Sequence, residues 1–495
     1  MADTLDWDAV ATDVLANYEA TGQWYSSGTP SFPVSVDWNA VAAEVLANLE
    51  ATGQWWYFQI PSPGPTAGAV VRTSTSAAGA EANERSLGAS LSGDGTKVAF
   101  ESLASNVIGD DLNGATDVFV KDLVSGGVSL VRASASGQTG SGASFEPSLS
   151  SDGGLLAFTI GSFPFTEVFV QDLRTGELTP VGETGRSSGS PSLSADGTIV
   201  AFTSSLVTFP TGPVPPQSPH APPNPPMVDT DVVVRDFATG RLVLASASEN
   251  GEEGNGRSFQ PAISRDGTKV AFVSDADNLV PGDDNGTSDV FVKDLVTGAI
   301  TLVSASSAGE QGNSGSLLPS ISADGTRVAF ESFASNLVPG DDNGTLDIFV
   351  KDLISGAVTL ASTSAEGEQG NGRSEFPSLS IDGRRVAFVS EATNLLPGDA
   401  NTASDVFVKD LVSGAITLAS ASSGGEQGNG SSGIPSLSAD GNMIAFDSEA
   451  SNLVPGDTNG VLDVFVKNLD GAFAAGAAAP ISDTTPPAAD MSPFG

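Results

Sequence analysis

The chain has 495 residues, 60 acidic and 20 basic, which gives a formal net charge of -40 and a pI near 4.1. Such a surface repels phosphate backbones and anionic lipid and attracts cations. The chain has no cysteine and one histidine, His220, so disulfides, thiolate chemistry and clusters of imidazole ligands are excluded. No run approaches the roughly 18 apolar residues of a membrane helix. We therefore expect neither nucleic-acid partners nor membrane insertion.

Residues 1–60 contain a duplicated segment. "LDWDAVATDVLANYEATGQWY" and "VDWNAVAAEVLANLEATGQWW" align at an offset of 31 residues. Asp6 and Asp37 are suitable helix N-caps, apolar residues follow at helical spacing, and Gly22 and Gly53 are suitable stops. We predict two short duplicated α-helices whose apolar faces pack on each other, on the next domain or on another protein.

Residues 66–470 are organised as seven repeats. Each repeat carries an Asp-Gly pair after a short serine-containing run, at Asp94, Asp152, Asp196, Asp266, Asp324, Asp382 and Asp440. Four of the six spacings are 58 residues, and the other two are 44 and 70. The second repeat lacks a loop that the others have, and the third carries a proline-rich excursion at 209–230, which we expect to be a surface loop.

A full repeat contains four strand signals. In the fifth repeat they are "PSISADG", "TRVAFES", "LDIFVKDL" and "AVTLASTS". Each is short and rich in residues that favour strands, and Asp-Gly and Ser-Gly pairs between them favour tight turns. The repeat is therefore predicted to be a four-stranded antiparallel meander. Seven such units around an axis make an all-β, seven-bladed β-propeller.

The ends of the repeat region indicate how the ring closes. The seventh repeat has no fourth strand, whereas "AGAVVRTSTS" at 67–76 matches the fourth-strand segment "SGAITLASAS" at 413–422 without three strands before it. We expect this N-terminal strand to complete the last blade, because an open blade edge invites pairing with another chain. Residues 471–495 are predicted to form a flexible C-terminal tail.

The repeat pattern "PSLSADGxxVAF…DVFVKDL" resembles the WD-like propeller repeats of the bacterial periplasmic TolB family, over roughly residues 66–470. The resemblance implies the propeller fold. Propellers of this kind serve as binding platforms, scaffolds and accessory domains of hydrolases, so the fold does not define one function. The chain differs from TolB in having seven repeats and an unrelated N-terminal region, so the role and partners of TolB are not carried over.

Five repeats carry an acidic loop with the pattern D-x-N-[GT]-x-x-D before the third strand. The pattern resembles the latter part of the calcium loops of integrin-type propellers, with proline replacing the first acidic ligand at Pro281, Pro339 and Pro455. Calcium takes six to eight oxygen ligands, and weak sites of ~10⁻⁴ to 10⁻³ M suit an extracellular setting. The same residue types also form turns without any metal, and both interpretations stay open. The candidate metal ligands are Asp111, Asn113, Asp117, Asp283, Asn285, Asp289, Asp341, Asn343, Asp347, Asp399, Asn401, Asp405, Asp457, Asn459 and Asp463.

The position of the acidic residues favours binding over catalysis. A glycosidase needs a carboxylate pair in a unique loop, whereas most acidic residues here lie in repeats. We predict a non-catalytic binding or scaffold propeller, extracellular or periplasmic although no N-terminal signal is visible, which binds protein or glycan on the face that bears the acidic loops. The alternative is a glycan-degrading hydrolase or lyase with its site over the propeller axis, using the unique loop at 206–230.

Overall fold

The computed structural model describes residues 67–470, apart from residues 110, 112, 132–141, 163–164, 184–185, 209–226 and 400. The predicted N-terminal helices, the C-terminal tail and residues 209–226 of the proline-rich excursion lie outside these residues. Residues 227–230, which were predicted to belong to that surface loop, instead begin a strand, because they pair antiparallel with residues 205–208. All described strands belong to the unit that spans residues 63–495. No helix in the described part of the chain has the length and hydropathy needed to cross a bilayer.

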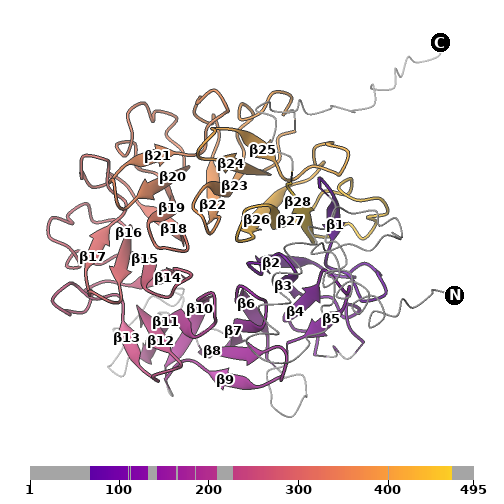
Figure 1. Ribbon diagram of the computed structural model, residues 1–495, viewed down its shortest axis with the longest axis horizontal. Helices are drawn as coiled ribbons and strands as arrows, with labels where there is room; N and C mark the ends of the chain where they lie inside the picture. The colour runs from indigo at the N-terminus through magenta and orange to yellow at the C-terminus, as the bar shows by residue number, and fades with distance from the viewer. Residues whose placement is uncertain are drawn as a thin grey trace, which may run out of the picture. The chain divides into compact units, whose positions relative to one another are not determined.

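Seven four-stranded sheets are arranged around one axis (Figure 1). Blade 1 contains β2 (Ser86–Leu91), β3 (Lys97–Ser102), β4 (Asp117–Asp122) and β5 (Val128–Leu130). Blade 2 contains β6 (Ser144–Leu149), β7 (Leu155–Ser162), β8 (Phe165–Asp172) and β9 (Leu178–Pro180). Blade 3 contains β10 (Ser187–Leu193), β11 (Ile199–Thr208), β12 (Met227–Asp236) and β13 (Leu242–Leu244). Blade 4 contains β14 (Ser258–Ile263), β15 (Lys269–Ser274), β16 (Asp289–Asp294) and β17 (Ile300–Leu302).

Blades 5 to 7 repeat the same plan. Blade 5 contains β18 (Ser316–Ile321), β19 (Arg327–Ser332), β20 (Asp347–Asp352) and β21 (Val358–Leu360). Blade 6 contains β22 (Ser374–Leu379), β23 (Arg385–Ser390), β24 (Asp405–Asp410) and β25 (Ile416–Leu418). Blade 7 contains β26 (Ser432–Leu437), β27 (Met443–Ser448), β28 (Asp463–Asn468) and β1 (Val70–Arg72). The first strand of each blade lies nearest the axis (Figure 1), so the predicted seven-bladed antiparallel propeller is confirmed.

The last blade is closed by the N-terminal strand, as predicted. Strand β1 pairs antiparallel with β28, with Val70 opposite Lys467 and Arg72 opposite Phe465. The sheet order is therefore β1-β28-β27-β26, and the outermost strand comes from the opposite end of the chain. Backbone hydrogen bonds extend the junction on both sides, from Gly68 N to Asn468 O and from Thr73 N to Val464 O.

The hydrophobic core lies between neighbouring blades. In the "VAF" segment of β3, Val98 and Phe100 belong to a cluster that includes residues of blade 7, whereas Ala99 faces the cluster shared with blade 2. Phe100 stacks on Phe119 of the adjacent strand with 5.8 Å between ring centroids, and blades 4 to 7 repeat this pair. Because a strand alternates its side chains between two faces, this segment puts bulky residues on one neighbour and a small residue on the other.

A ring of backbone hydrogen bonds encircles the axis. It connects residues just before or within the Asp-Gly turns of successive blades. Its members are Asp94 N to Ser151 O, Ser151 N to Ala195 O, Ala195 N to Arg265 O, Asp266 N to Ala323 O, Ala323 N to Ile381 O, Ile381 N to Ala439 O, and Ala439 N to Gly93 O. The last bond returns to the first blade, so the ring is closed at its centre as well as at its rim.

The two faces of the propeller differ in their connections. One face, here called the turn face, carries the tight turns after the first and third strands. The other, here called the loop face, carries the loops after the second and fourth strands. Contacts between these two sets of loops confirm that they share a face, for example Asn313 N to Asn336 Oδ1 at 2.9 Å. The five acidic loops all lie on the loop face.

Deletion of residues 66–78 removes the strand that completes blade 7. We expect this variant to unfold at a lower temperature or to oligomerise, because the exposed edge of β28 can pair with another chain. Size-exclusion chromatography with light scattering and a thermal melt are the measurements. Deletion of residues 1–60 is the control and should change the oligomeric state and the melting temperature less. A monomer with an unchanged melting temperature after the first deletion would refute the closure.

Candidate functional site

The acidic loop of blade 4 brings its three predicted ligands together in a turn. Asn285 Nδ2 donates to Asp289 Oδ2 at 2.8 Å, and Asn285 Oδ1 accepts from Thr287 N at 2.8 Å. Gly286 has a φ of 67°, in the left-handed region where glycine is favoured. Asp289 begins β16, so the rigid sheet fixes its carboxylate at the end of the loop.

A glutamine from the neighbouring loop joins the two carboxylates. Gln311 Nε2 donates to Asp283 Oδ1 at 2.6 Å and to Asp289 Oδ2 at 2.9 Å. Ser304 Oγ donates to the other oxygen, Asp289 Oδ1, at 2.6 Å. This arrangement, here called the glutamine bridge, connects the loop after the second strand to the loop after the fourth strand. The single NH₂ group of the glutamine donates one hydrogen bond to each of the two adjacent carboxylates.

Blades 5 and 6 repeat the glutamine bridge. In blade 5, Gln369 Nε2 lies 2.8 Å from Asp341 Oδ1 and 2.9 Å from Asp347 Oδ2, and Asn343 Nδ2 also donates to Asp347. In blade 6, Gln427 Nε2 lies 2.8 Å from Asp399 Oδ1 and 2.7 Å from Asp405 Oδ2. Asn401 of that loop donates to the backbone oxygen of Gly428.

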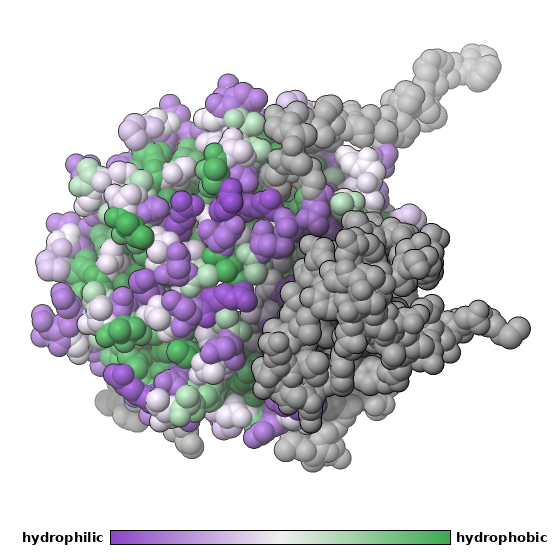
Figure 2. Space-filling model, in the orientation of Figure 1, coloured by the Kyte–Doolittle hydropathy of each residue, from purple (hydrophilic) through white to green (hydrophobic). Residues whose placement is uncertain are grey.

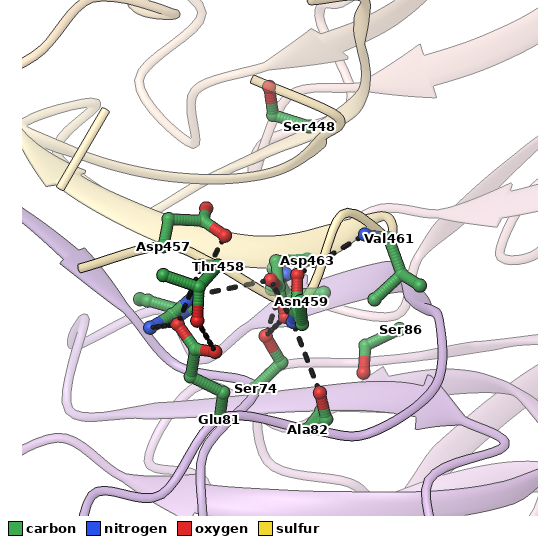
Figure 3. Close-up of polar contacts among 12 residues, drawn as sticks. Ser74, Glu81, Ala82, Ser86, Ser448, Asp457, Thr458, Asn459, Val461 and Asp463 are labelled. Carbon is green, nitrogen blue, oxygen red and sulfur yellow. Dashed lines mark hydrogen bonds and ion pairs between the residues drawn. The ribbon is translucent and has the colours of Figure 1, made fainter. Parts of the chain in front are cut away.

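Blade 7 uses an ion pair in place of the amide (Figure 3). Glu81 stands at the position of Gln311, and Arg72 of β1 stands at the position of Leu302. The Arg72 guanidinium lies 2.7 Å from Glu81, 3.1 Å from Asp457 and 3.4 Å from Asp463. Asn459 Nδ2 donates to Asp463 Oδ2 and Ser74 Oγ to Asp463 Oδ1, as the equivalent residues do in blades 4 and 5. The extra carboxylate of Glu81 is therefore matched by an extra cation.

Blade 1 has the same acidic loop without an amide or guanidinium bridge among the described residues. Asn113 Oδ1 accepts from Ala115 N at 2.8 Å, and Ser144 Oγ makes a long 3.5 Å contact to Asp117 Oδ1. Asp111 Oδ1 and Asp117 Oδ2 are buried and have no hydrogen-bond partner within the described part of the chain. By sequence register, Thr139, which lies outside the described residues, stands where blade 4 has Gln311.

Burial changes the acidity of these carboxyl groups. Desolvation is the largest influence on each of the ten, and it raises their pKa values in all five loops. The pKa of Asp117 and of Asp405 rises to about 6, with the neighbouring carboxylate adding to the effect. Hydrogen bonds from serine, asparagine and glutamine oppose this rise by stabilising the ionised form. The loops therefore hold closely spaced carboxyl groups that bind protons more readily than free carboxyl groups do.

The structure brings each predicted ligand set together, yet the fit to a metal differs among blades. Within the described residues no group of three or more histidine, cysteine, aspartate or glutamate side chains forms a metal cluster. In blades 4 to 6 the oxygens that a cation would need already accept hydrogen bonds from the glutamine bridge. A cation there would have to displace that amide. Calcium binding by these loops stays a prediction.

Sequence reasoning missed the role of the lysine in "FVKDL". Lys293 Nζ of β16 donates to the backbone oxygens of Ala247 and Ser248, in the preceding blade, at 2.8 and 2.9 Å. Lys121, Lys351, Lys409 and Lys467 make equivalent contacts with the blade before their own. Burial lowers the pKa of Lys409 and of Lys467 to about 8. The recurrence of this lysine within an otherwise apolar strand was the available signal.

Sequence reasoning also missed a repeat position that is acidic in only three of the seven blades. Glu101 and Glu331 follow the "VAF" segment of blades 1 and 5, and Asp447 follows the equivalent "IAF" segment of blade 7. Each accepts a backbone N–H from the next blade, from Glu146, Phe376 and Gly88 respectively. These donors lie in the innermost strands at positions with positive φ. Burial raises the pKa of all three carboxyl groups, that of Asp447 to about 6. Variation at one position of a regular repeat was the signal.

Comparison with known proteins supports the fold. No family model matches the chain, and no curated protein matches it. An oligogalacturonate lyase solved with manganese is similar over 83% of this chain and 95% of its own, with 14% identity and a TM-score of 0.50. The match to TolB from Acinetobacter baumannii covers 79% of this chain and 70% of TolB, with 15% identity and a TM-score of 0.38. The match to an acylaminoacyl peptidase covers 75% of this chain and 49% of the peptidase, with 11% identity and a TM-score of 0.47. The chain is a seven-bladed β-propeller with distant structural matches to TolB and oligogalacturonate lyase.

Replacement of Arg72 tests the charge balance in blade 7. Arg72→Leu leaves three carboxylates together, two of them buried, and should lower the free energy of unfolding by about 3–5 kcal/mol. The double variant Arg72→Leu/Glu81→Gln reproduces the Leu302 and Gln311 pair of blade 4 and should recover most of the loss. Urea unfolding of both variants measures this. A double variant as unstable as the single one would show that the two arrangements are not equivalent.

The raised carboxyl pKa values predict higher stability in mild acid. Between an unfolded pKa of about 3.9 and the folded value of about 6, Asp117, Asp405 and Asp447 bind more protons in the folded state. Their contribution to the free energy of unfolding therefore rises as the pH falls through 6. Turn aspartates such as Asp152, whose pKa is lowered by the Gly154 N–H, act in the opposite direction. Their contribution to the free energy of unfolding is lost when stronger acid protonates them.

Without added calcium, we therefore expect the chain to be more stable at pH 5 than at pH 7 in urea titrations. Asp447→Asn should reduce the difference, because it removes one of the titrating groups. Equal stability at the two pH values would contradict the assigned burial of these carboxyl groups.

Proposed function

We propose that the protein is a non-catalytic binding or scaffold propeller that acts outside the cell or in the periplasm and binds its partner on the loop face. The observation that supports this most is the cross-connection of neighbouring loops by glutamine bridges in blades 4 to 6 and by Arg72 in blade 7. These contacts hold the loops in one arrangement before any partner arrives, and a preformed surface loses less conformational entropy on binding.

The charge of the loop face supports a cationic partner. Exposed acidic side chains follow the second or fourth strands over blades 3 to 7: Glu249, Glu252, Glu253, Asp275, Asp277, Asp284, Glu310, Asp342, Glu366, Glu368, Glu391 and Glu449. Hydrophilic groups are interspersed among hydrophobic ones over the described part of the face drawn in Figure 2. A concentration of one charge sign steers oppositely charged partners and makes their association salt-dependent. We propose a basic protein segment as the ligand, with a glycan as the alternative outcome of the test.

Calcium forms part of the proposal. The acidic loops would supply carboxylate oxygens to the ion, which would offset the self-repulsion of a chain with a net charge of -40. The fit is strongest in blade 1, where no described side chain bridges the carboxylates.

Two matched triple variants test which face binds. Glu252→Gln, Glu310→Gln and Glu368→Gln neutralise equivalent exposed positions of the loop face. Val296→Lys, Ile354→Lys and Val412→Lys change the net charge equally at exposed positions of the turn face. Binding of lysine-rich peptides and of a glycan panel is measured by biolayer interferometry at several salt concentrations. The first triple variant should weaken peptide binding about tenfold or more, and the second should not. Equal loss in both variants, or binding of glycans alone, would contradict the proposed partner.

One observation favours the alternative, a glycan-degrading hydrolase or lyase with its site over the axis. Glu101 and Asp447 stand at a repeat position that is acidic in only three blades, they interact electrostatically next to the innermost strands, and burial raises both pKa values. Acid and base catalysis requires such tuned pairs. Both groups are also used to accept backbone N–H groups, which is a structural role. Release of reducing ends or unsaturated products from a glycan panel, lost in Asp447→Asn, would establish the enzyme.

A further inference from the structure

The five acidic loops share one backbone pattern but satisfy their carboxylates in three ways. Blades 4, 5 and 6 use a glutamine amide, and blade 7 uses the Arg72 guanidinium. In blade 1 the position of Arg72 is held by Leu130 and that of Gln311 by Thr139. Neither residue carries an amide or guanidinium group. Among the described residues, blade 1 is therefore the copy in which no amide or guanidinium bridge between the paired carboxylates is seen.

The carboxylates of this loop are deeply buried. Asp111 is 3% exposed and Asp117 is 6% exposed. Asn113 forms hydrogen bonds with both carboxyl groups. Asp111 Oδ1 and Asp117 Oδ2 nevertheless have no hydrogen-bond partner among the described residues, whereas Asp283 Oδ1 and Asp289 Oδ2 both accept from Gln311. A buried carboxylate oxygen without a partner carries a large desolvation cost. The equivalent oxygens of the other blades avoid that cost through a donor placed between the two carboxylates.

We propose that a divalent cation, calcium in an extracellular setting, binds between Asp111 and Asp117 of blade 1 and takes the place that the glutamine amide holds in blades 4 to 6. Hard oxygen ligands on a glycine-containing loop suit calcium, and Gly114 has a φ of 66°. Two carboxylates supply only part of the coordination shell, so water completes it and the affinity is weak, on the order of 10⁻⁴ to 10⁻³ M. The inference deepens the calcium part of the proposed function by restricting it to one loop.

Two other groups could neutralise the same pair. Arg132 stands, by sequence register, where blade 4 has Ser304, and it lies outside the described residues. A proton shared between Asp111 and Asp117 is the second, since the pKa of Asp117 is raised to about 6 by burial and by Asp111. A guanidinium between the carboxylates would leave no calcium site at pH 7.5. A shared proton would compete with calcium only as the pH falls through 6, so calcium binding that is present at pH 7.5 and lost at pH 5 would reveal it.

Isothermal titration of the whole chain with calcium chloride at pH 7.5 counts the sites. The wild type should bind one calcium per chain, and its melting temperature should rise with calcium concentration. Asp111→Asn/Asp117→Asn should lose the bound ion and the shift in melting temperature. The control Asp283→Asn/Asp289→Asn changes the equivalent residues of blade 4 and should keep both. Thr139→Gln places a glutamine at the position that holds one in blades 4 to 6, and it should abolish calcium binding without lowering stability. This variant tests the site if the double variant does not fold.

The count separates this inference from the wider calcium proposal. No calcium bound by the wild type would overturn both, and calcium binding regained in Arg132→Ser would identify the guanidinium as the group that had occupied the place. Several ions per chain, with loss of one in the blade 4 control, would keep the wider proposal and overturn the restriction to blade 1. Binding of the basic peptides does not enter this test, so failure of the proposed partner leaves the result unaffected.

Discussion

Closure of the ring is the constraint on which the rest of this propeller depends. Each blade packs its core against two neighbours, so a break anywhere would expose both an apolar blade face and a strand edge. The chain closes the ring at two radii. At the rim, β1 pairs with β28 across almost the whole length of the repeat region. At the axis, seven backbone hydrogen bonds pass from turn to turn and return from Ala439 to Gly93.

The repeated letters of the sequence follow from this constraint. The phenylalanine and valine of "VAF" fill the space toward one neighbour, and the alanine admits the bulky residues of the other. The lysine of "FVKDL" extends through that apolar interface to backbone oxygens of the preceding blade. Burial of an ammonium group is costly unless its donors are satisfied, and here the ends of neighbouring fourth strands supply the acceptors. The lysine thus connects adjacent blades at a depth where the core is otherwise apolar.

The acidic loops show how one local geometry can be stabilised by different chemistry. An Asp-x-Asn-Gly turn, with threonine for glycine in blade 6, places two carboxylates side by side, and their mutual repulsion must be offset by a donor or a cation. Gln311 and its equivalents provide a neutral donor, whereas Arg72 provides a charge together with the additional carboxylate of Glu81. Because all five copies keep the two aspartates and the asparagine of the pattern, they allow the groups that lie between the carboxylates to be compared.

Much of the fold was predictable from the sequence. The period of the Asp-Gly turns defined seven blades, strand signals defined the meander, and the match between residues 67–76 and 413–422 predicted that β1 completes blade 7. Those features are local or repetitive, and a period of two or a turn residue can be read without knowing its neighbours. The grouping of Asp283, Asn285 and Asp289 was predictable for the same reason, since seven consecutive residues hold all three.

What lies between those carboxylates was decided by the tertiary structure. Gln311 is 28 residues from Asp283, and Arg72 is 391 residues from Asp463, so no local pattern connects them. The lysine clamps and the carboxylates Glu101, Glu331 and Asp447 likewise act on the adjacent blade. The sequence by itself determined the repeat, its turns and the ring closure, because these depend on short-range backbone preference and on the alternation of apolar side chains. Only the packed ring decided which carboxylates acquire a donor and which do not, because the donors come from loops that meet only when neighbouring strands and blades are assembled.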